Sequence, residues 1–277
     1  NIDSKINGTI DLAELAKAFP MEGVSKLNGI ISSNLTAKTS MSAIDAQDYE
    51  NVDMDGDIKI DNLAYQTEGT PLVQVSTMQM NFTPKFVKLD RFEAQLGKSD
   101  IKAEGKIDNL LAYFSPEKTM TGNMNIRSNF FDANEWIPEE ETSTQPSNIS
   151  VKSNDQVDVF DRFDFTVDGE IKKILYDVYE LRESKLVGNV TPNAADIQTL
   201  QTKIGESDFK MNGKFTNILN YIVENETLKG DINLNSDYIN ANEFISEEEV
   251  PVEEMEVFPI PEKMELNIDA NIGEVLY

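Results

Sequence analysis

The residue types that most often perform enzymatic chemistry are missing from this chain. Its 277 residues include no histidine and no cysteine, which removes the commonest general base, the commonest zinc ligand and any thiolate nucleophile. Acidic residues are plentiful, at 50 against 24 basic ones, and a pair of carboxylates can hydrolyse a glycosidic bond. No carboxylate has an aromatic-rich sequence setting, however, and Trp136 is the single tryptophan. The sequence therefore predicts a protein that is not an enzyme and uses no cofactor, with a carboxylate-based hydrolase as the minor alternative.

One segment resembles the first half of a calcium-binding loop. Asn51, Asp53 and Asp55 alternate ahead of Gly56, as oxygen ligands do in an EF-hand loop. The twelfth position is Asn62 instead of the bidentate glutamate, and the flanks have a strand pattern where helices would be needed. The segment is therefore better interpreted as the solvated face of a strand, and we predict no metal site.

The charge balance restricts the possible partners. A net charge of −26 disfavours nucleic acid and anionic membrane surfaces, because both are negatively charged. No run of about 18 apolar residues occurs, so we expect no membrane span within this segment. The acidic runs at residues 139–141 and 247–249 are expected in solvated loops. Because the chain starts at Asn1 and ends on a new strand pattern, we interpret it as a piece of a larger protein with its targeting signal or anchor elsewhere.

An internal repeat is the strongest signal in the sequence. Residues 96–141 align without a gap with residues 204–249, and about 20 of the 46 pairs are identical. Self-similarity at a fixed offset is the signature of a repeat architecture. A short theme also recurs, in which an apolar residue is followed two positions later by glycine and then by another apolar residue, as in Met120-x-Gly122-x-Met124 and Leu228-x-Gly230-x-Ile232.

The repeat divides the chain into five parts. Residues 1–50 are predicted to be the tail of a preceding repeat, 51–141 the first repeat, 142–157 a polar linker, 158–249 the second repeat, and 250–277 an acidic, proline-containing linker with the start of a third repeat. Polar and proline-rich stretches of this kind are typical of surface loops.

Alternation of apolar and polar residues dominates both repeats. A period of two is typical of half-buried antiparallel strands, with one apolar and one polar face. The segments at residues 97–100 and 205–208 have turn composition and are expected to join strands as hairpins. The fold class predicted is mainly β, a long antiparallel meander of tandem repeats that forms a folded-over sheet or groove with short interspersed helices.

Short helices are expected at a few places. The pattern predicts a helix over residues 11–19, and helices over 109–114 and 217–222 with Asn109 or Asn217 as a cap. Single helical turns are expected at residues 132–137 and 240–245.

A sheet with one continuous apolar face needs a cover. The cover can be a second sheet, closure into a barrel, or an apolar ligand such as lipid. From the residues alone, a sandwich packed on itself and an open groove stay equal alternatives. The methionines of these strands would give a soft, adaptable lining, but from the sequence alone ordinary core residues are the favoured interpretation: Met78, Met80, Met120, Met124 and Met211.

The two copies resemble the C-terminal region of the AsmA family. The resemblance lies in a Leu-Gly-x-Ser strand end, an Ile-Lys-Ala-Glu-Gly-Lys-Ile strand, an Asn-Leu-Leu-x-Tyr segment and an Asp-x-Asn-Glu-Trp/Phe turn, over residues 96–137 and 204–245. AsmA proteins are β-rich envelope proteins of Gram-negative bacteria, and they are similar to TamB and to bridge-like lipid transfer proteins.

The resemblance implies a non-enzymatic periplasmic segment, tethered to the inner membrane from outside this piece. It would bind or conduct phospholipid along an apolar β-groove and support outer-membrane assembly and homeostasis, with other envelope proteins as further partners. The expected lining residues are Ile101, Ala103, Met120, Met124 and Ile126 in the first copy, and Phe209, Met211, Leu228, Ile232 and Leu234 in the second. The alternatives are a structural or adhesive β-repeat protein with closed cores and no ligand, or a scaffold that uses edge strands for β-augmentation.

Overall fold

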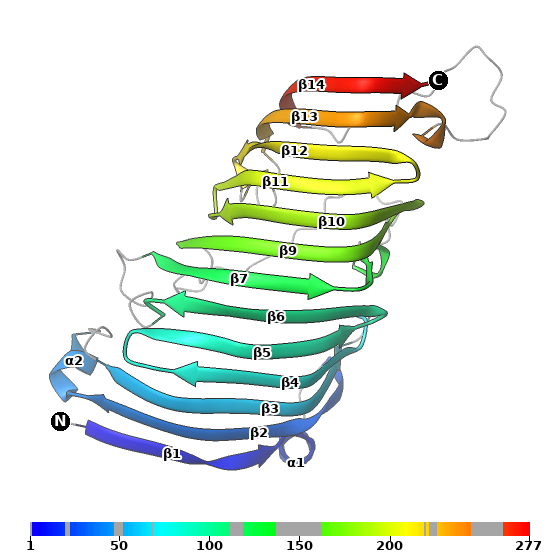
Figure 1. The fold of residues 1–277 in the computed structure, drawn as a ribbon. Helices are drawn as coiled ribbons and strands as arrows, with labels where there is room; N and C mark the ends of the chain where they lie inside the picture. The colour runs from blue at the N-terminus through cyan, green and yellow to red at the C-terminus, as the bar shows by residue number, and fades with distance from the viewer. Residues whose placement is uncertain are drawn as a thin grey trace.

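The chain folds into one long sheet in the computed structural model, and Figure 1 shows it from its first strand, β1, to its last, β14. The structure describes residues 2–19, 23–46, 52–67, 69–110, 119–136, 162–218, 220–221, 226–244 and 263–277. Its sheet has 14 strands in the order β1-β2-β3-β4-β5-β6-β7-β9-β10-β11-β12-β13-β14, with β8 paired to β9 beside this path. The predicted mainly β meander is confirmed, and the two ends of the sheet do not meet.

The strands comprise Ile2–Asp11 (β1), Val24–Thr39 (β2), Asp53–Thr67 (β3), Val73–Phe82 (β4), Phe86–Leu96 (β5), Ser99–Asp108 (β6), Met120–Ser128 (β7), Phe131–Asp132 (β8), Phe163–Tyr176 (β9), Tyr179–Val190 (β10), Ala194–Ile204 (β11), Ser207–Thr216 (β12), Leu228–Asn240 (β13) and Met264–Leu276 (β14). The described helices are α1 (Leu12–Ala18) and α2 (Met41–Asp45), with 3-10 turns η3 (Ala133–Glu135) and η4 (Ala241–Phe244).

Neighbouring strands are antiparallel except at the ends of the two repeats. There, β7 pairs with β9 in parallel, β8 pairs with β9 in parallel, and β13 pairs with β14 in parallel. The element order recurs accordingly, with five long strands β3 to β7 before η3 and five long strands β9 to β13 before η4. The numerical boundaries of the repeats stay a prediction, because residues 137–161 and 245–262 lie outside the described part of the chain.

The predicted turns and the N-terminal helix are found. Helix α1 falls within residues 11–19, and the Asp11 carboxylate caps it by accepting hydrogen bonds from Ala13 N (2.9 Å) and Glu14 N (3.3 Å). Turns η3 and η4 occupy the expected places, and the two Gly-x-Ser-Asp segments join β5 to β6 and β11 to β12 as hairpins. Helix α2, which Ser40 caps, was not predicted.

Two other helix predictions reach beyond what is described. Residues 111–118 lie outside the described part, so the helix over 109–114 is untested. Residues 218 and 220–221 are helical, and Tyr221 N donates to Asn217 O at 3.0 Å. An N-cap residue normally has an extended backbone. Asn109 and Asn217 instead have left-handed φ angles, +60° and +67°, so neither has the usual geometry of the predicted cap.

The calcium-loop resemblance falls within a strand. Asp53, Asp55 and Asp57 occupy alternate positions of β3 and are all exposed, and Asn51 lies outside the described residues. Side chains at alternate positions point from the same face of a strand. These carboxylates are therefore the solvated face of β3, as the strand pattern indicated.

The described strands form a single layer (Figure 1). Helix α1 packs beside β1 and β2 at one end of the sheet, and no second sheet lies against either face among the described strands. In the described part of the chain, no helix is long and apolar enough to cross a membrane.

Candidate functional site

Strand register aligns one residue from every strand except β8 in a continuous uncharged row across the sheet. Directly paired residues of neighbouring strands project from the same face. We call this the central row; it runs through Gly8, Ser33, Ile58, Met80, Leu89, Gly105, Met124, Val167, Gly188, Ile197, Gly213, Ile232 and Ile268. It contains no charged residue, and its twelve strand-to-strand steps of about 4.8 Å give a length of about 58 Å.

The adjacent row projects from the opposite face and is polar throughout. We call it the polar row; it runs through Asn7, Asn34, Asp57, Asn81, Lys88, Lys106, Asn123, Thr166, Asn189, Asp196, Lys214, Asp231 and Asn267. The sheet is thus two-sided over its full length. We name the side that carries the central row the apolar face.

All ten predicted lining residues lie on the apolar face. In the first copy, Ala103 pairs with Ile126, and Met124 pairs with Gly105 on one side and Val167 on the other. In the second copy, Met211 pairs with Leu234, and Ile232 pairs with Gly213 and Ile268. The register also places the remaining members on this face: Ile101, Met120, Phe209 and Leu228.

The ten side chains are neither fully buried nor fully exposed. Each of the ten is half-buried, whereas a closed sandwich core would bury them almost completely. Exposure increases at the two edges of the sheet, where Ile6 is 60% exposed and Ile268 is 53% exposed. Half-burial is the degree of covering that neighbouring strands alone provide, so the apolar face can still receive a ligand.

The recurring glycine theme has a packing reason. A Cβ at Gly122 would lie 2.6 Å from Cε1 of Phe165, and one at Gly230 would lie 3.0 Å from Cδ1 of Phe215. The ring of the neighbouring strand therefore lies over each glycine, which is how an aromatic side chain protects a glycine within a sheet. Similarly, the sulfur of Met124 lies 3.2 Å from where a Cβ of Gly105 would be. At these three positions, large residues on one strand fill the space left by glycine on the next, so the apolar surface is continuous there.

At one end of the strands of each repeat lies a cluster of hydrogen bonds around a buried serine, which we call the corner. In the second repeat the corner consists of Ser207, Asn240, Glu243 and Glu206. The Ser207 hydroxyl is fully buried; it accepts from Asn240 N (2.9 Å) and donates to the Glu243 carboxylate (2.8 Å). That carboxylate also accepts from Glu206 N in the hairpin turn, at 2.6 Å. The 3-10 turn η4 is thus tied to the β11–β12 hairpin just before the chain leaves for the parallel strand β14.

The first repeat has the same corner. Ser99 is fully buried and accepts from Asp132 N at 2.8 Å, and the Glu135 carboxylate accepts from Lys98 N at 2.7 Å. The turn glycine Gly97 has a φ of +60°, and a Cβ there would be 2.5 Å from a Glu135 oxygen. The sequence analysis did not predict these contacts. The available signal was that the Gly-x-Ser-Asp segment and the glutamate of the 3-10 turn are identical in the two aligned repeats.

The aspartate that follows each corner serine binds the backbone. Burial raises the pKa of Asp100, but hydrogen bonds from Phe130 N (2.8 Å) and from Asn129 outweigh it, and the net pKa is below its ordinary value. Burial likewise raises the pKa of Asp208, and bonds from Tyr238 N and Asp237 N bring it below the ordinary value. Both carboxylates are therefore structural, and they stay ionised at neutral pH.

We expect Ser207→Ala to lower the free energy of unfolding by about 1–3 kcal/mol, because the part-buried Asn240 N–H loses its acceptor and the Glu243 carboxylate loses a donor. Urea unfolding followed by circular dichroism would measure the change. Ser4→Ala on the exposed strand β1 is the control and should stay within about 0.5 kcal/mol of the parent. Equal midpoints for both variants would contradict a stabilising role for the corner.

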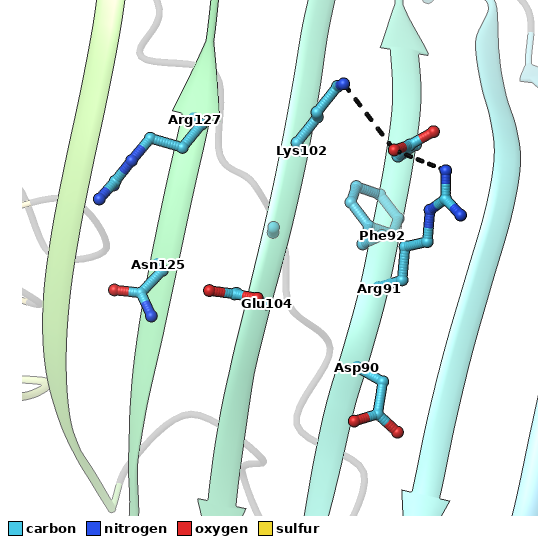
Figure 2. Close-up of a pocket in the computed structure, with 9 residues that line it drawn as sticks. Asp90, Arg91, Phe92, Lys102, Glu104, Asn125 and Arg127 are labelled. Carbon is cyan, nitrogen blue, oxygen red and sulfur yellow. Dashed lines mark hydrogen bonds and ion pairs between the residues drawn. The ribbon is translucent and has the colours of Figure 1, made fainter.

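A shallow hollow of about 280 Å³ lies over β5, β6 and β7 (Figure 2). Its cations already have partners: Arg91 binds Glu93 at 3.0 Å, Lys102 lies 3.8 Å from the same carboxylate, and Arg127 binds Asp168 at 2.8 Å. These three cations of the hollow are therefore each within ion-pair distance of a carboxylate. Within the ranges that the structure describes, no three acidic side chains gather closely enough to hold a metal ion.

The site is therefore a surface formed by the apolar face of the sheet. Its features are an uncharged row about 58 Å long, half-buried side chains and a polar opposite face. Comparisons with family models, with curated proteins and with solved structures found no match to this chain.

Proposed function

We propose that the apolar face binds the acyl chains of phospholipid and that the protein is not an enzyme. The observation that carries this proposal is the central row, which crosses the sheet without a charge and has no second sheet over it among the described residues. Contiguous apolar surface of more than a few hundred Å² on a soluble protein marks an interaction site. Each 100 Å² that a ligand covers would contribute about 2.5 kcal/mol.

The dimensions of the face suit acyl chains. Along β6, the apolar positions extend from Ile101 to Ile107, which is about 20 Å at about 3.3 Å per residue. An acyl chain occupies half of a hydrocarbon core about 30 Å thick, and thus about 15 Å. A chain that lies along a strand therefore fits on the face, and its headgroup can stay in water beyond the strand end.

Continuity favours conduction over storage at one place. The same row connects both repeats, and large side chains of neighbouring strands lie over the glycines of the theme. Together with the resemblance to the AsmA family, this supports the finer proposal that the segment works in the periplasm, is tethered to the inner membrane, and conducts phospholipid for outer-membrane assembly and homeostasis. Other envelope proteins would then be further partners.

The alternatives make different demands on the sheet. A structural or adhesive repeat protein with closed cores would need each apolar face covered by protein, and the open layer of the described strands weighs against it. A scaffold would use its edges: β1 and β14 have one neighbour each in the described sheet. Strand addition at those edges would leave the central row in water, so the lipid proposal explains more of the molecule.

A photo-crosslinking residue at Met124 should form lipid adducts, whereas the same residue at Asn125 should not. Met124 belongs to the central row, and Asn125 pairs with Glu104 and Asp168 on the opposite face. The chain would be mixed with vesicles of phosphatidylethanolamine and phosphatidylcholine, which carry no net charge, irradiated, and analysed by mass spectrometry. We expect at least about tenfold more adduct at Met124.

The matched pair makes the result interpretable, because the two positions are adjacent in one strand. Equal yields would indicate non-specific contact with the vesicles. Absence of adducts at both positions would contradict lipid binding and favour a face that protein covers.

A further inference from the structure

Methionine is concentrated on the apolar face. The chain has ten methionines, and those on this face are Met54, Met78, Met80, Met120, Met124, Met211 and Met264. All seven are half-buried. Of the others, Met41 lies on α2 and is 62% exposed, and Met21 and Met255 lie outside the described residues. The thioethers thus line the surface on which the proposed ligand would lie.

The two repeats differ in this respect. Met120 and Met124 of β7 correspond to Leu228 and Ile232 of β13 at the offset of the repeat, and the register places both pairs on the apolar face. Strands β3 to β7 carry five of the thioethers, whereas β9 to β13 carry only Met211 among their described residues. The first repeat is therefore rich in sulfur, and the second has branched aliphatic residues at the two positions equivalent to Met120 and Met124.

We propose that the thioethers of β3, β4 and β7 are a reversible oxidation site that weakens lipid binding by the first repeat. The proposal rests on the proposed function, because it concerns the same face. The oxidant is hydrogen peroxide: the O–O bond breaks, one oxygen forms a bond to the methionine sulfur, and water leaves. The sulfur loses two electrons and the peroxide gains them. Because the chain has no cysteine, no thiol competes within it, and sulfoxide reductases can reverse the change.

The consequence follows from where the sulfurs lie. Met80 and Met124 are members of the central row, and the Met124 sulfur lies over Gly105. A sulfoxide converts an apolar side chain into a polar one. Oxidation therefore interrupts the row between β4 and β7 and leaves the row from β9 to β14 apolar.

The test uses the 277-residue chain, hydrogen peroxide and a fluorescent fatty acid as probe. Peptide mass spectrometry would locate the sulfoxides, and circular dichroism would check that the sheet persists. We expect sulfoxide at the five first-repeat positions and fewer probe molecules bound per chain, because the first repeat should lose affinity at least about tenfold while the row from β9 to β14 stays apolar. Two variants are each compared with and without peroxide. In the variant with Met→Leu at positions 54, 78, 80 and 120 combined with Met124→Ile, probe binding should be the same before and after treatment, whatever its untreated level, whereas Met41→Leu should lose binding on treatment as the parent does.

Each outcome decides something different. If the untreated chain does not bind the probe, the proposed function fails and this inference fails with it. If the untreated chain binds and the oxidised chain binds equally well, the oxidation proposal alone is overturned. Oxidation confined to Met41, or peroxide sensitivity retained by the five-position variant, would overturn it as well.

Discussion

Replacing Gly56 by alanine should lower the free energy of unfolding by about 3 kcal/mol. Gly56 has a φ of +132° within β3, a backbone conformation that residues with a side chain rarely adopt. A Cβ at this position would lie 2.0 Å from the Asn34 carbonyl oxygen and 3.0 Å from Cα of Leu35. Both atoms belong to the backbone of β2, so neither can move aside without breaking the register between two long strands.

The control for this variant is Gly8→Ala in β1. A Cβ at Gly8 meets nothing within 4 Å, and its φ is not in the left-handed region. This change should stay within about 0.5 kcal/mol of the parent. Urea unfolding followed by the β signal in circular dichroism would compare the two. Equal unfolding midpoints for Gly56→Ala and Gly8→Ala would mean that β2 and β3 are not locked at this point.

Alternation alone was enough to predict the fold class. Because side chains point to opposite faces with a period of two, residues such as Met211 and Leu234 could be assigned to one face before their pairing was known. The gap-free repeat then placed the ten expected lining residues consistently, since equivalent strands must face the same way. All ten lie on the apolar face.

Long-range features could not be predicted in the same way. The closeness of Ser207 to Asn240, 33 positions away in the chain, depends on the path between them, and no local propensity encodes that path. The parallel pairing of β7 with β9 has the same origin, because segments outside the described residues connect these strands. The need for glycine at position 56 could not be predicted either, because it depends on how closely the backbone of β2 approaches Gly56. Whether the sheet closes is also a property of the whole chain, so the sequence left the sandwich and the groove as equal alternatives.

Replacing Ile232 by aspartate should weaken binding of a fluorescent fatty acid to the second repeat by about 100-fold. Ile232 lies in the central row between Gly213 and Ile268. An acyl chain over this position would have to cover an ionised carboxylate without a cation to pair it, because the row has no charged member, and an unpaired buried charge is costly. The control is Asn233→Asp, the next residue in β13, which adds the same charge to the opposite face and should leave binding unchanged.

The same variant separates a conducting surface from independent binding patches. A crosslinking residue at Met124 reports on the first repeat, and one at Leu266 reports on β14, beyond the new carboxylate. If chains bind locally, Ile232→Asp should keep adducts at Met124 and abolish them at Leu266, since Leu266 pairs with Gly230 beside the changed position. If lipid moves along the central row, the rate of phospholipid transfer from donor to acceptor vesicles should fall in Ile232→Asp by as large a factor as the yield of adducts at Leu266. The yield of adducts at Met124 should stay unchanged. Equal transfer by the variant and by Asn233→Asp would contradict conduction along the central row, because one carboxylate would then interrupt the row without consequence.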